Sequence, residues 1–483
     1  MVEYTPIQDI PTIHSDLRKT FRTGITKPYE WRRHQLLQLA RFAQENSDAL
    51  AECLRLDLGR SKQEAIMGDV SAVISRCLLA AEKLEEWMKP EPVVVNSPLQ
   101  RGFKTSVERH PKGIVLIVSP WNFPIILSLQ PLYGAISAGC CAAIKPSEMS
   151  PNCSAFLAEN LHKYLDPSAY RVILGGVPEM TKVLELKWDH ICYTGNGRVG
   201  RIISAAAAKH LTPLTLELGG KSPVIIDSTA DISLAAKRIL WGKIFNTGQI
   251  CVAPDYILAE KSIIPALVEA LKEHYHAFYP NGALASDSYG HIISDSHLER
   301  LKGLVEKTKG TIVFGGTWEG KARRSFEPTL VVDVKEDDIL LEEEIFGPIL
   351  PIVAVEDLDE AIAFVNNRDH PLVSYIFSNN EDFKQKFIAN TTSGNVWIGD
   401  TFQQVGVSEV PFGGVGESGY GRQSMKACFD DFSYQRGLVE IPDGIEPFLT
   451  ARYPPYTEGS LEIITQMINQ PIPPSDPATP GRL

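Results

Sequence analysis

The sequence contains little cysteine: eight residues in 483, with no C-x-x-C pair and no histidines at the spacing of metal ligands. Sparse, scattered thiols are not typical of a disulfide-stabilised secreted domain or of a zinc site. The N-terminus also lacks the charged-then-apolar pattern of a signal peptide. We therefore expect no metal and a reducing, cytoplasmic environment. A peroxisome is the alternative, because Gly481-Arg482-Leu483 resembles a peroxisomal signal.

Positive charge is scarce and long apolar runs are interrupted, which excludes two kinds of partner. Lys and Arg number 47 against 59 Asp and Glu, giving a net charge of -12. Because nucleic acids bind to positive surfaces, we expect no nucleic-acid partner. Residues 113–144 carry no charge and are long enough for a membrane span, but Pro120, Pro124 and Pro131 interrupt them. We therefore expect no integral membrane segment.

The sequence does contain a regular alternation of strand and helix patterns. Its length suits two or three domains. Helical spacing predicts one helix over Trp31–Leu56 and another over Gln63–Met88. Short apolar runs, typical of strands buried on both faces of a parallel sheet, then alternate with helical patterns at Gly113–Ser119, Cys140–Lys145, Tyr170–Leu174 and His190–Thr194. A second alternation begins at Ser222, so the predicted fold class is α/β with a doubly wound sheet.

A glycine-rich loop, Gly195-Asn-Gly-Arg-Val-Gly200, follows the last of these runs and precedes a predicted helix over Val199–Lys209. Strand, G-x-G-x-x-G and helix in this order are typical of a pyrophosphate site at a helix N-terminus. The usual dinucleotide pattern has an acidic residue about 20 positions later on the ribose. Glu217 stands at that distance, although it also has the surroundings of a catalytic group.

Two residues have the context of reactive groups: Glu217 in Thr-Leu-Glu-Leu-Gly-Gly, and Cys251 in Phe-Asn-Thr-Gly-Gln-Ile-Cys-Val-Ala-Pro. Gly248 permits close approach of the backbone to a reacting group, and an accessible thiolate near a base is a nucleophile. Taken singly, Cys251 is as well explained by a small buried hydrophobe, and Glu217 by a strand that ends in a turn.

Together these segments resemble the active-site signatures of the aldehyde dehydrogenase superfamily. Further matching motifs are Pro120-Trp-Asn122-Phe-Pro124, Glu343-Glu-Ile-Phe-Gly-Pro348 and Pro411-Phe-Gly-Gly414. Ala207-Ala-Lys-His-Leu-Thr-Pro213 and Arg452-Tyr-Pro-Pro455 resemble the class 3 branch, which includes fatty and aromatic aldehyde dehydrogenases. The resemblance implies oxidation of an aldehyde to a carboxylic acid through a thiohemiacetal and a thioester. It makes Cys251 the nucleophile, Glu217 the general base and Asn122 a donor to the oxyanion.

The resemblance also implies a dinucleotide site, with NAD as cofactor and NADP possible. Lys145 and Glu148 would hold the adenosine ribose, which leaves Glu217 free for chemistry. Glu344 would bond the nicotinamide ribose and Phe346 would pack beside the nicotinamide. The remaining cofactor residues that it implies are Ser119, Trp121, Gly195, Asn196, Gly200 and Leu218.

By the same resemblance the chain divides into a Rossmann-like cofactor domain, residues 1–92 and 109–217, and an α/β catalytic domain, residues 218–411. A β-hairpin oligomerisation arm, residues 93–108 and 412–440, would support a homodimer, and residues 441–483 form a tail. The branch suggests an apolar or aromatic aldehyde. Met67-Gly68 and Gly399-Asp-Thr-Phe-Gln-Gln404 depart from the branch pattern at the substrate mouth, which leaves the aldehyde open.

Two other functions fit parts of this pattern. In a CoA-acylating relative, CoA would take the acyl group, although the presence of Glu217 argues against this. A catalytically silent NAD-binding protein of the same fold would need none of Asn122, Glu217 and Cys251, and all three are present.

Overall fold

The computed structural model describes residues 3–97, 100–320, 323–469 and 471–473. The chain divides into two compact units, Met1–Trp87 with His110–Tyr434 and Met88–Arg109 with Gln435–Leu483. The predicted division into cofactor and catalytic domains is finer than these units and stays a prediction.

The larger unit contains a six-stranded sheet with the strand order β15-β7-β6-β3-β4-β5. Its strands are β3 (Ile114–Val118), β4 (Cys141–Lys145), β5 (Tyr170–Val172), β6 (His190–Thr194), β7 (Leu214–Glu217) and β15 (Gly419–Tyr420). All are parallel except β15, which pairs with β7 in the antiparallel sense. Every residue of β3, β4 and β6 is buried, as the continuous apolar runs predicted.

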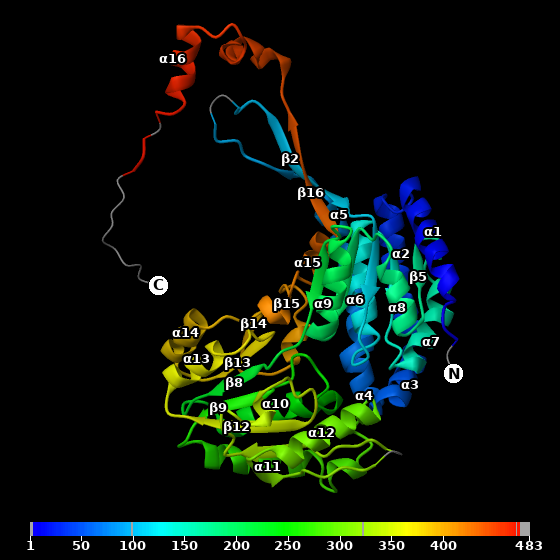
Figure 1. Cartoon of the computed structure of the whole chain (residues 1–483), viewed down its shortest axis with the longest axis vertical. Helices are drawn as coiled ribbons and strands as arrows, with labels where there is room; N and C mark the ends of the chain where they lie inside the picture. Colours follow the sequence, from blue (N-terminus) through cyan, green and yellow to red (C-terminus); the bar gives the residue numbers. More distant parts are fainter. Residues whose placement is uncertain (1–2, 98–99, 321–322, 470, 474–483) are drawn as a thin grey trace. The chain divides into compact units, whose positions relative to one another are not determined.

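Helices connect these strands (Figure 1). They are α6 (Ile126–Ala138), α7 (Pro151–Asn160), α8 (Val177–Leu184) and α9 (Gly197–Ala208). The chain runs outward in one direction from β3 to β5 and in the other from β6 to β7. Right-handed crossovers therefore place α6 and α7 on one face and α8 and α9 on the other. The predicted doubly wound sheet is confirmed, and its strand order reverses between β3 and β6, where such folds bind ligands.

The N-terminal helices differ from the prediction at one point. The helix predicted over Trp31–Leu56 is two helices, α2 (Tyr29–Glu45) and α3 (Ser47–Leu58). Asn46 lies between them, and its Nδ2 donates to the carbonyl of Phe42 at 2.8 Å. This side-chain bond ends α2, because asparagine competes for the backbone groups that would continue a helix.

The second predicted helix, Gln63–Met88, is helical throughout but not uniform. It comprises α4 (Lys62–Ala65), a π-helical turn η2 (Ile66–Val70) and α5 (Ser71–Met88). Single π-turns inside helices frequently occur at functional sites. A Cβ on Gly68 of this turn would lie 3.1 to 3.2 Å from the rings of Phe245 and Phe123, so the turn packs tightly against both aromatic residues.

A seven-stranded sheet in the same unit has the order β10-β11-β12-β9-β8-β13-β14. Its strands are β8 (Pro223–Ile226), β9 (Tyr256–Glu260), β10 (Thr311–Phe314), β11 (Thr329–Val332), β12 (Ile349–Val355), β13 (Val373–Phe377) and β14 (Asn395–Ile398). Its helices are α10 (Ile232–Ile244), α11 (Ile264–Phe278), α12 (Asp295–Lys307), α13 (Leu358–Asn366) and α14 (Glu381–Asn390). Only the β10–β11 pair is antiparallel. The second predicted alternation is thus confirmed, although the sequence analysis did not identify α14.

The smaller unit contains β1 (Glu91–Pro92), most of β2 (Lys104–Pro111) and most of β16 (Ser433–Glu440), in the order β1-β2-β16. Its C-terminal helix α16 (Glu458–Gln466) begins at a Thr457–Ser460 capping box and lies within the segment predicted as a tail. The tripeptide Gly481-Arg482-Leu483 lies outside the described residues. Among the helices of the described residues, none has the length and apolar character needed to cross a membrane.

Candidate active site

The segment before Cys251 has an unusual backbone. After α10, a short helical turn η4 (Phe245–Gly248) holds Asn246, Thr247 and Gly248 at φ values of 48°, 56° and 72°. Left-handed residues in succession cost energy and persist where the surroundings fix them. A Cβ on Gly248 would lie 2.3 Å from the carbonyl oxygen of Gly347, so only glycine fits there. The turn carries the chain out of α10 and brings Cys251 to the wall of a cavity.

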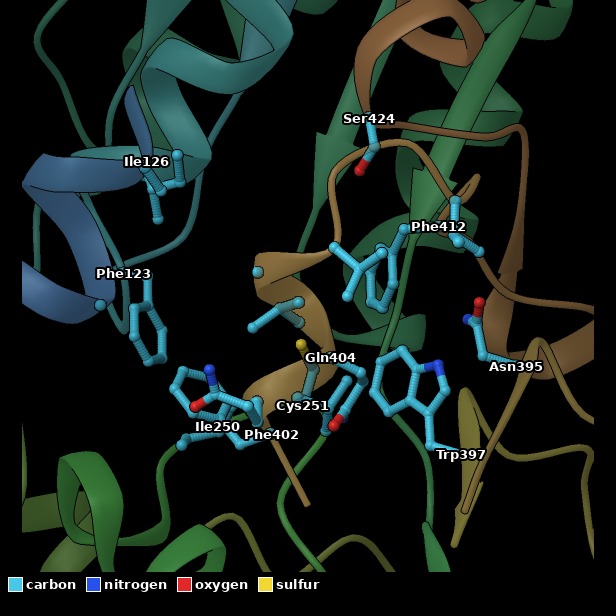
Figure 2. A pocket seen from close by; sticks show the side chains of 18 of the residues that line it. Phe123, Ile126, Ile250, Cys251, Asn395, Trp397, Phe402, Gln404, Phe412 and Ser424 are labelled. Carbon is cyan, nitrogen blue, oxygen red and sulfur yellow. The ribbon is translucent and has the colours of Figure 1, made fainter. Parts of the chain in front are cut away.

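That cavity has a volume of about 420 Å³ and an aromatic lining. Figure 2 shows the Cys251 side chain among Ile250, Phe402 and Gln404, with Phe123 on one side and Trp397 on the other. The other lining residues include Met67, Gly68, Ile126, Leu127, Trp241, Val405, Val407, Val410 and Phe412, with Arg76, Gln130, Asn395 and Ser424 as polar members. Met67 and Gly68, where the sequence departs from the class 3 pattern, thus line the same cavity as Cys251.

The Cys251 thiol has a raised pKa in the chain without ligands. Burial, followed by the charges of Glu344 and Glu217, raises the pKa of Cys251 to about 12, against the backbone N–H groups of Cys251 and Val252. The thiol is therefore protonated at neutral pH. The contributions of Glu217 and Glu344 also show that both carboxyl groups lie within electrostatic range of the sulfur.

Alkylation of Cys251 by iodoacetamide is therefore expected to accelerate with pH. Because a raised pKa leaves little thiolate at pH 7, the rate should rise about tenfold per unit between pH 7 and 10 in the ligand-free protein. Mass spectrometry of the peptide that contains Cys251 measures this rate separately from the other seven cysteines. A rate that has already reached its plateau at pH 8 would contradict the raised pKa.

Glu217 ends β7 and is held there by both neighbouring strands. Its Cα pairs with Thr194 of β6 and with Gly419 of β15. The residue is 5% exposed, and within the described part of the chain neither carboxylate oxygen has a hydrogen-bond partner. Burial first and Asp431 second raise the pKa of Glu217 well above its usual value, against Arg422. Burial therefore favours the neutral form of this carboxyl group, and it can accept a proton only when it is ionised.

Asn122 lies in the loop after β3 and is bound to the Cys251 segment. Its Nδ2 donates to the carbonyl of Gln249 at 3.0 Å. Its own carbonyl accepts from Asn246 Nδ2 at 3.0 Å, so two hydrogen bonds join the loop to the turn before Cys251. Of the three predicted catalytic side chains, Cys251 alone is among the described residues that line the aromatic cavity. Asn122 is tied to the cysteine segment, and Glu217 interacts electrostatically with the thiol.

The residues predicted for the adenosine ribose lie together. Lys145 ends β4 and its Nζ donates to Glu148 at 2.7 Å. Beside them is a second cavity of about 420 Å³, lined by Tyr4, Pro146, Glu148, Pro151, Ser154, Leu174 and Gly175. It lies where β4 and β5 end, the edge at which doubly wound sheets bind nucleotides. Its size, and the pair that Glu148 of its lining forms with Lys145, fit the adenosine half of a dinucleotide.

The glycine-rich loop begins α9 as predicted. Asn196 caps this helix, because its Oδ1 accepts from the N–H of Val199 at 3.0 Å, and its carbonyl accepts from Gly200. A pyrophosphate at this helix N-terminus would therefore meet the N–H groups of Gly197 and Arg198. A Cβ on Gly200 would lie 3.3 Å from Leu218, so the last glycine of the loop allows close packing of α9 on the end of β7.

The residues predicted for the nicotinamide half lie in loops next to both sheets. A Cβ on Gly219 would lie 2.2 Å from Glu344 Oε2, which places that carboxylate against the turn after Glu217. Burial and Asp255 raise the pKa of Glu344 to about 8, against a hydrogen bond from the Gly220 N–H. Phe346, at φ 45°, packs edge-on against Trp121 with ring centres 5.4 Å apart. Ser119, two residues before Trp121, is buried, and its Oγ lies 2.6 Å from Ser128 Oγ.

Sequence analysis did not single out Arg60, although it contacts the Asn122 loop. Its Nη2 donates to the carbonyl of Asn122 at 2.6 Å, and its Nε donates to Asn246 Oδ1 at 2.8 Å. The only local signal is the position of a charged residue directly after Gly59, which ends α3 in the left-handed conformation at φ 68°. Such a position is usually solvent-exposed, and Arg60 is fully buried.

Comparison with known proteins establishes the class. The "Aldehyde dehydrogenase family" profile matches residues 8–437. The chain therefore belongs to the aldehyde dehydrogenase family, and the predicted fold class is confirmed. The solved structure of Staphylococcus aureus AldH in its substrate-bound state superposes with a TM-score of 0.91 at 37% identity, covering 95% of this chain and 99% of that one.

Within the family, several similar proteins are named as members of family 3. "Aldehyde dehydrogenase family 3 member B2" of Mus musculus is 43% identical over 457 residues, 95% of this chain and 94% of the relative. "Aldehyde dehydrogenase, dimeric NADP-preferring" of Rattus norvegicus is 42% identical over 438 residues, 91% of this chain and 96% of the relative. The predicted class 3 resemblance is confirmed, and the chain is an NAD(P)-dependent aldehyde dehydrogenase that oxidises aldehydes to carboxylic acids.

Proposed function

We propose that this enzyme oxidises apolar and aromatic aldehydes with Cys251 as nucleophile, Glu217 as general base and Asn122 as oxyanion donor. The observation that carries the proposal is the position of Cys251 in the wall of the aromatic cavity, with Asn122 bonded to the same segment. An apolar cavity stabilises a hydrophobic substrate by removing its surface from water.

The chemistry follows from the placement of these groups. The Cys251 thiol first loses its proton to water, and the thiolate then adds to the aldehyde carbon, because a hydride can leave only a tetrahedral, electron-rich carbon. Asn122 Nδ2 and the Cys251 N–H stabilise the resulting oxyanion of the thiohemiacetal. The bound dinucleotide supplies the hydride acceptor. The thioester that remains on Cys251 is attacked by water, from which ionised Glu217 takes a proton, and the carboxylic acid leaves with the Cys251 thiolate restored.

The substrate class is tested by an NADH-release screen across aliphatic, aromatic, isoprenoid and charged aldehydes. We expect long-chain, aromatic and isoprenoid aldehydes to show kcat/KM values at least about tenfold above those of short, charged aldehydes, since each buried methylene contributes about 0.8 kcal/mol. CoA is left out of the assay, because a CoA-acylating enzyme would then stop turning over. Equal kcat/KM for charged and apolar aldehydes would contradict the proposed substrate class.

The cofactor preference depends on Glu148. We propose that NAD is preferred and NADP accepted, because the Glu148 carboxylate repels a 2'-phosphate whereas Lys145 attracts one. The Rattus norvegicus relative is named NADP-preferring, which makes this a sharp test. The residues that would hold the cofactor are Lys145 and Glu148 at the adenosine end, Gly195, Asn196, Gly200 and Leu218 at the glycine-rich loop, and Ser119, Trp121, Glu344 and Phe346 at the nicotinamide end.

Glu148→Gln is expected to raise the NADP-to-NAD ratio of kcat/KM about tenfold or more. The change removes the repelling charge and keeps Lys145, and like charges in contact cost several kcal/mol. Glu159→Gln, an exposed carboxylate on helix α7, which follows the turn that carries Glu148, is the matched control and should leave the ratio unchanged. A wild-type ratio that favours NADP, or a ratio unmoved by Glu148→Gln, would contradict the proposed role.

The assembly is proposed from the name of a similar protein, and the compartment from the state of the cysteines. We propose a homodimer formed through residues 93–108 and the segment after Phe412, since the Rattus norvegicus relative is described as dimeric. Light scattering of the full chain tests the dimer. A cytoplasmic location is supported by the eight cysteines, all of which lie in the described residues and are free thiols.

A further inference from the structure

Arg60 is a buried cation with partners on three separate segments. It is 0% exposed, and its Nη1 pairs with the carboxylate of Asp69, which is also fully buried, on the π-helical turn η2. Nε donates to Asn246 Oδ1 and Nη2 donates to the carbonyl of Asn122. The guanidinium carbon also lies 4.0 Å from the ring centre of Phe123. An uncompensated buried charge is very costly, so this ion pair fixes the geometry of its neighbours.

These partners lie on segments that precede Cys251 or that line the same cavity. Asn246 lies in the left-handed turn before Cys251, and its Nδ2 donates to the carbonyls of Asn122 and Gln249, each at 3.0 Å. Asp69 accepts the N–H of Ile126 at 2.7 Å, just after the Asn122 loop. Arg60 therefore fixes the loop that carries Asn122 relative to the turn that leads to Cys251.

The bonds of the Asn122 side chain explain why the relative position of the loop and the turn matters. One of its two amide N–H groups donates to the carbonyl of Gln249, which orients the amide beside the cysteine segment. Because the amide group is planar, this bond also fixes the direction of the other N–H. An oxyanion donor is effective only within a few tenths of an ångström of its productive position. Its main-chain carbonyl has two donors, Arg60 and Asn246, so the loop cannot shift without breaking both bonds.

We propose that Arg60 is a positioning residue of the reaction: it sets the Asn122 amide relative to Cys251 and thereby tunes stabilisation of the oxyanion. The inference rests on the proposed roles of Cys251 and Asn122. A guanidinium is required because its planar fork reaches three acceptors in fixed directions, whereas the single ammonium of lysine cannot hold all three. Arg60 is not among the described residues that line the aromatic cavity, so it acts through Asn122.

The test is a double-mutant cycle of Arg60→Lys and Asn122→Ala. We expect Asn122→Ala to lower kcat about 100-fold or more and Arg60→Lys to lower kcat about 10- to 100-fold, with the KM for NAD unchanged. In the double variant, Arg60→Lys should add less than about twofold, because the group that it positions is gone. A purely structural Arg60 would instead lower kcat by the same factor in both backgrounds, and that outcome would overturn the inference.

Two further variants control for loss of folding. Arg32→Lys replaces another buried arginine, which donates to the carbonyls of Thr26 and Ser137, and should lower the thermal midpoint while leaving kcat within about twofold. If Arg60→Lys does not fold, Asp69→Asn keeps an acceptor for the Ile126 N–H and should show the same non-additivity with Asn122→Ala. A full-activity Asn122→Ala would overturn the proposed function instead, so the two failures are distinguishable.

Discussion

Cys251→Ala is expected to lower NADH formation by about 10⁴-fold or more, because without the sulfur no tetrahedral adduct forms and the aldehyde carbon cannot release a hydride. The protein should remain folded, since the change removes one sulfur atom from the wall of an open cavity. Cofactor affinity, measured by equilibrium binding of NAD, should stay within a few fold of the wild-type value. The measurement is steady-state NADH release with an aromatic aldehyde, together with thermal unfolding.

Cys53→Ala is the matched control, because Cys53 is another partly exposed thiol, on α3 and outside the cavity. It should retain full turnover. A covalent adduct on the peptide containing Cys251, trapped by acid quench and seen by mass spectrometry in the wild-type enzyme, would locate the thioester directly. Unchanged NADH formation by Cys251→Ala would refute the nucleophilic role of Cys251.

Glu217→Gln is expected to lower kcat about 100- to 1000-fold while still releasing one NADH per site in a rapid burst. Loss of the general base stops hydrolysis of the thioester but leaves its formation intact. Rapid-mixing absorbance at the NADH band separates the burst from turnover. A slow NADH phase with no burst would assign Glu217 to an earlier step, such as activation of the thiol.

The same substitution should make the protein more stable. The pKa of Glu217 is raised by folding, so ionisation opposes the native state, and the cost grows as the pH rises above the unfolded value near 4.5. Glutamine has no such cost, and the gain in thermal midpoint should therefore increase from pH 5 to pH 8. Glu327→Gln is the control, because that carboxylate accepts from Tyr275 at 2.6 Å and from Thr317 at 2.5 Å; it should gain no stability.

The sheets were predictable because their signal is local. A charge-free apolar run such as Gly113–Ser119 is typical of a strand whose two faces are both buried. β3 lies within this run. The break at Asn46 was missed because the apolar spacing of α2 continues into α3, and the bond from Asn46 to Phe42 is not visible in that spacing. α14 was missed because one buried residue, Phe387, gives too little periodicity to mark a helix.

The candidate site divides in the same way. Cys251 and Glu217 were found because glycines that permit close packing surround them and because their motifs occur together. The structure places them within electrostatic range of each other, although their catalytic roles stay a prediction. Arg60 could not be found, because its burial depends on Asp69, Asn122 and Asn246, and the last two are distant in the chain.

Glu217 is located by main-chain pairing on both sides of β7, and among the described residues its carboxylate oxygens have no hydrogen-bond partner. Substitutions of neighbouring side chains should therefore leave its position unchanged, because main-chain pairing fixes it and the described residues include no hydrogen-bond partner for its carboxylate. A single-residue deletion in β7 is different, since it would turn the acid to the opposite face of the sheet. The position of this carboxyl group along the sheet is thus set by the pairing of β7 with β6 and β15.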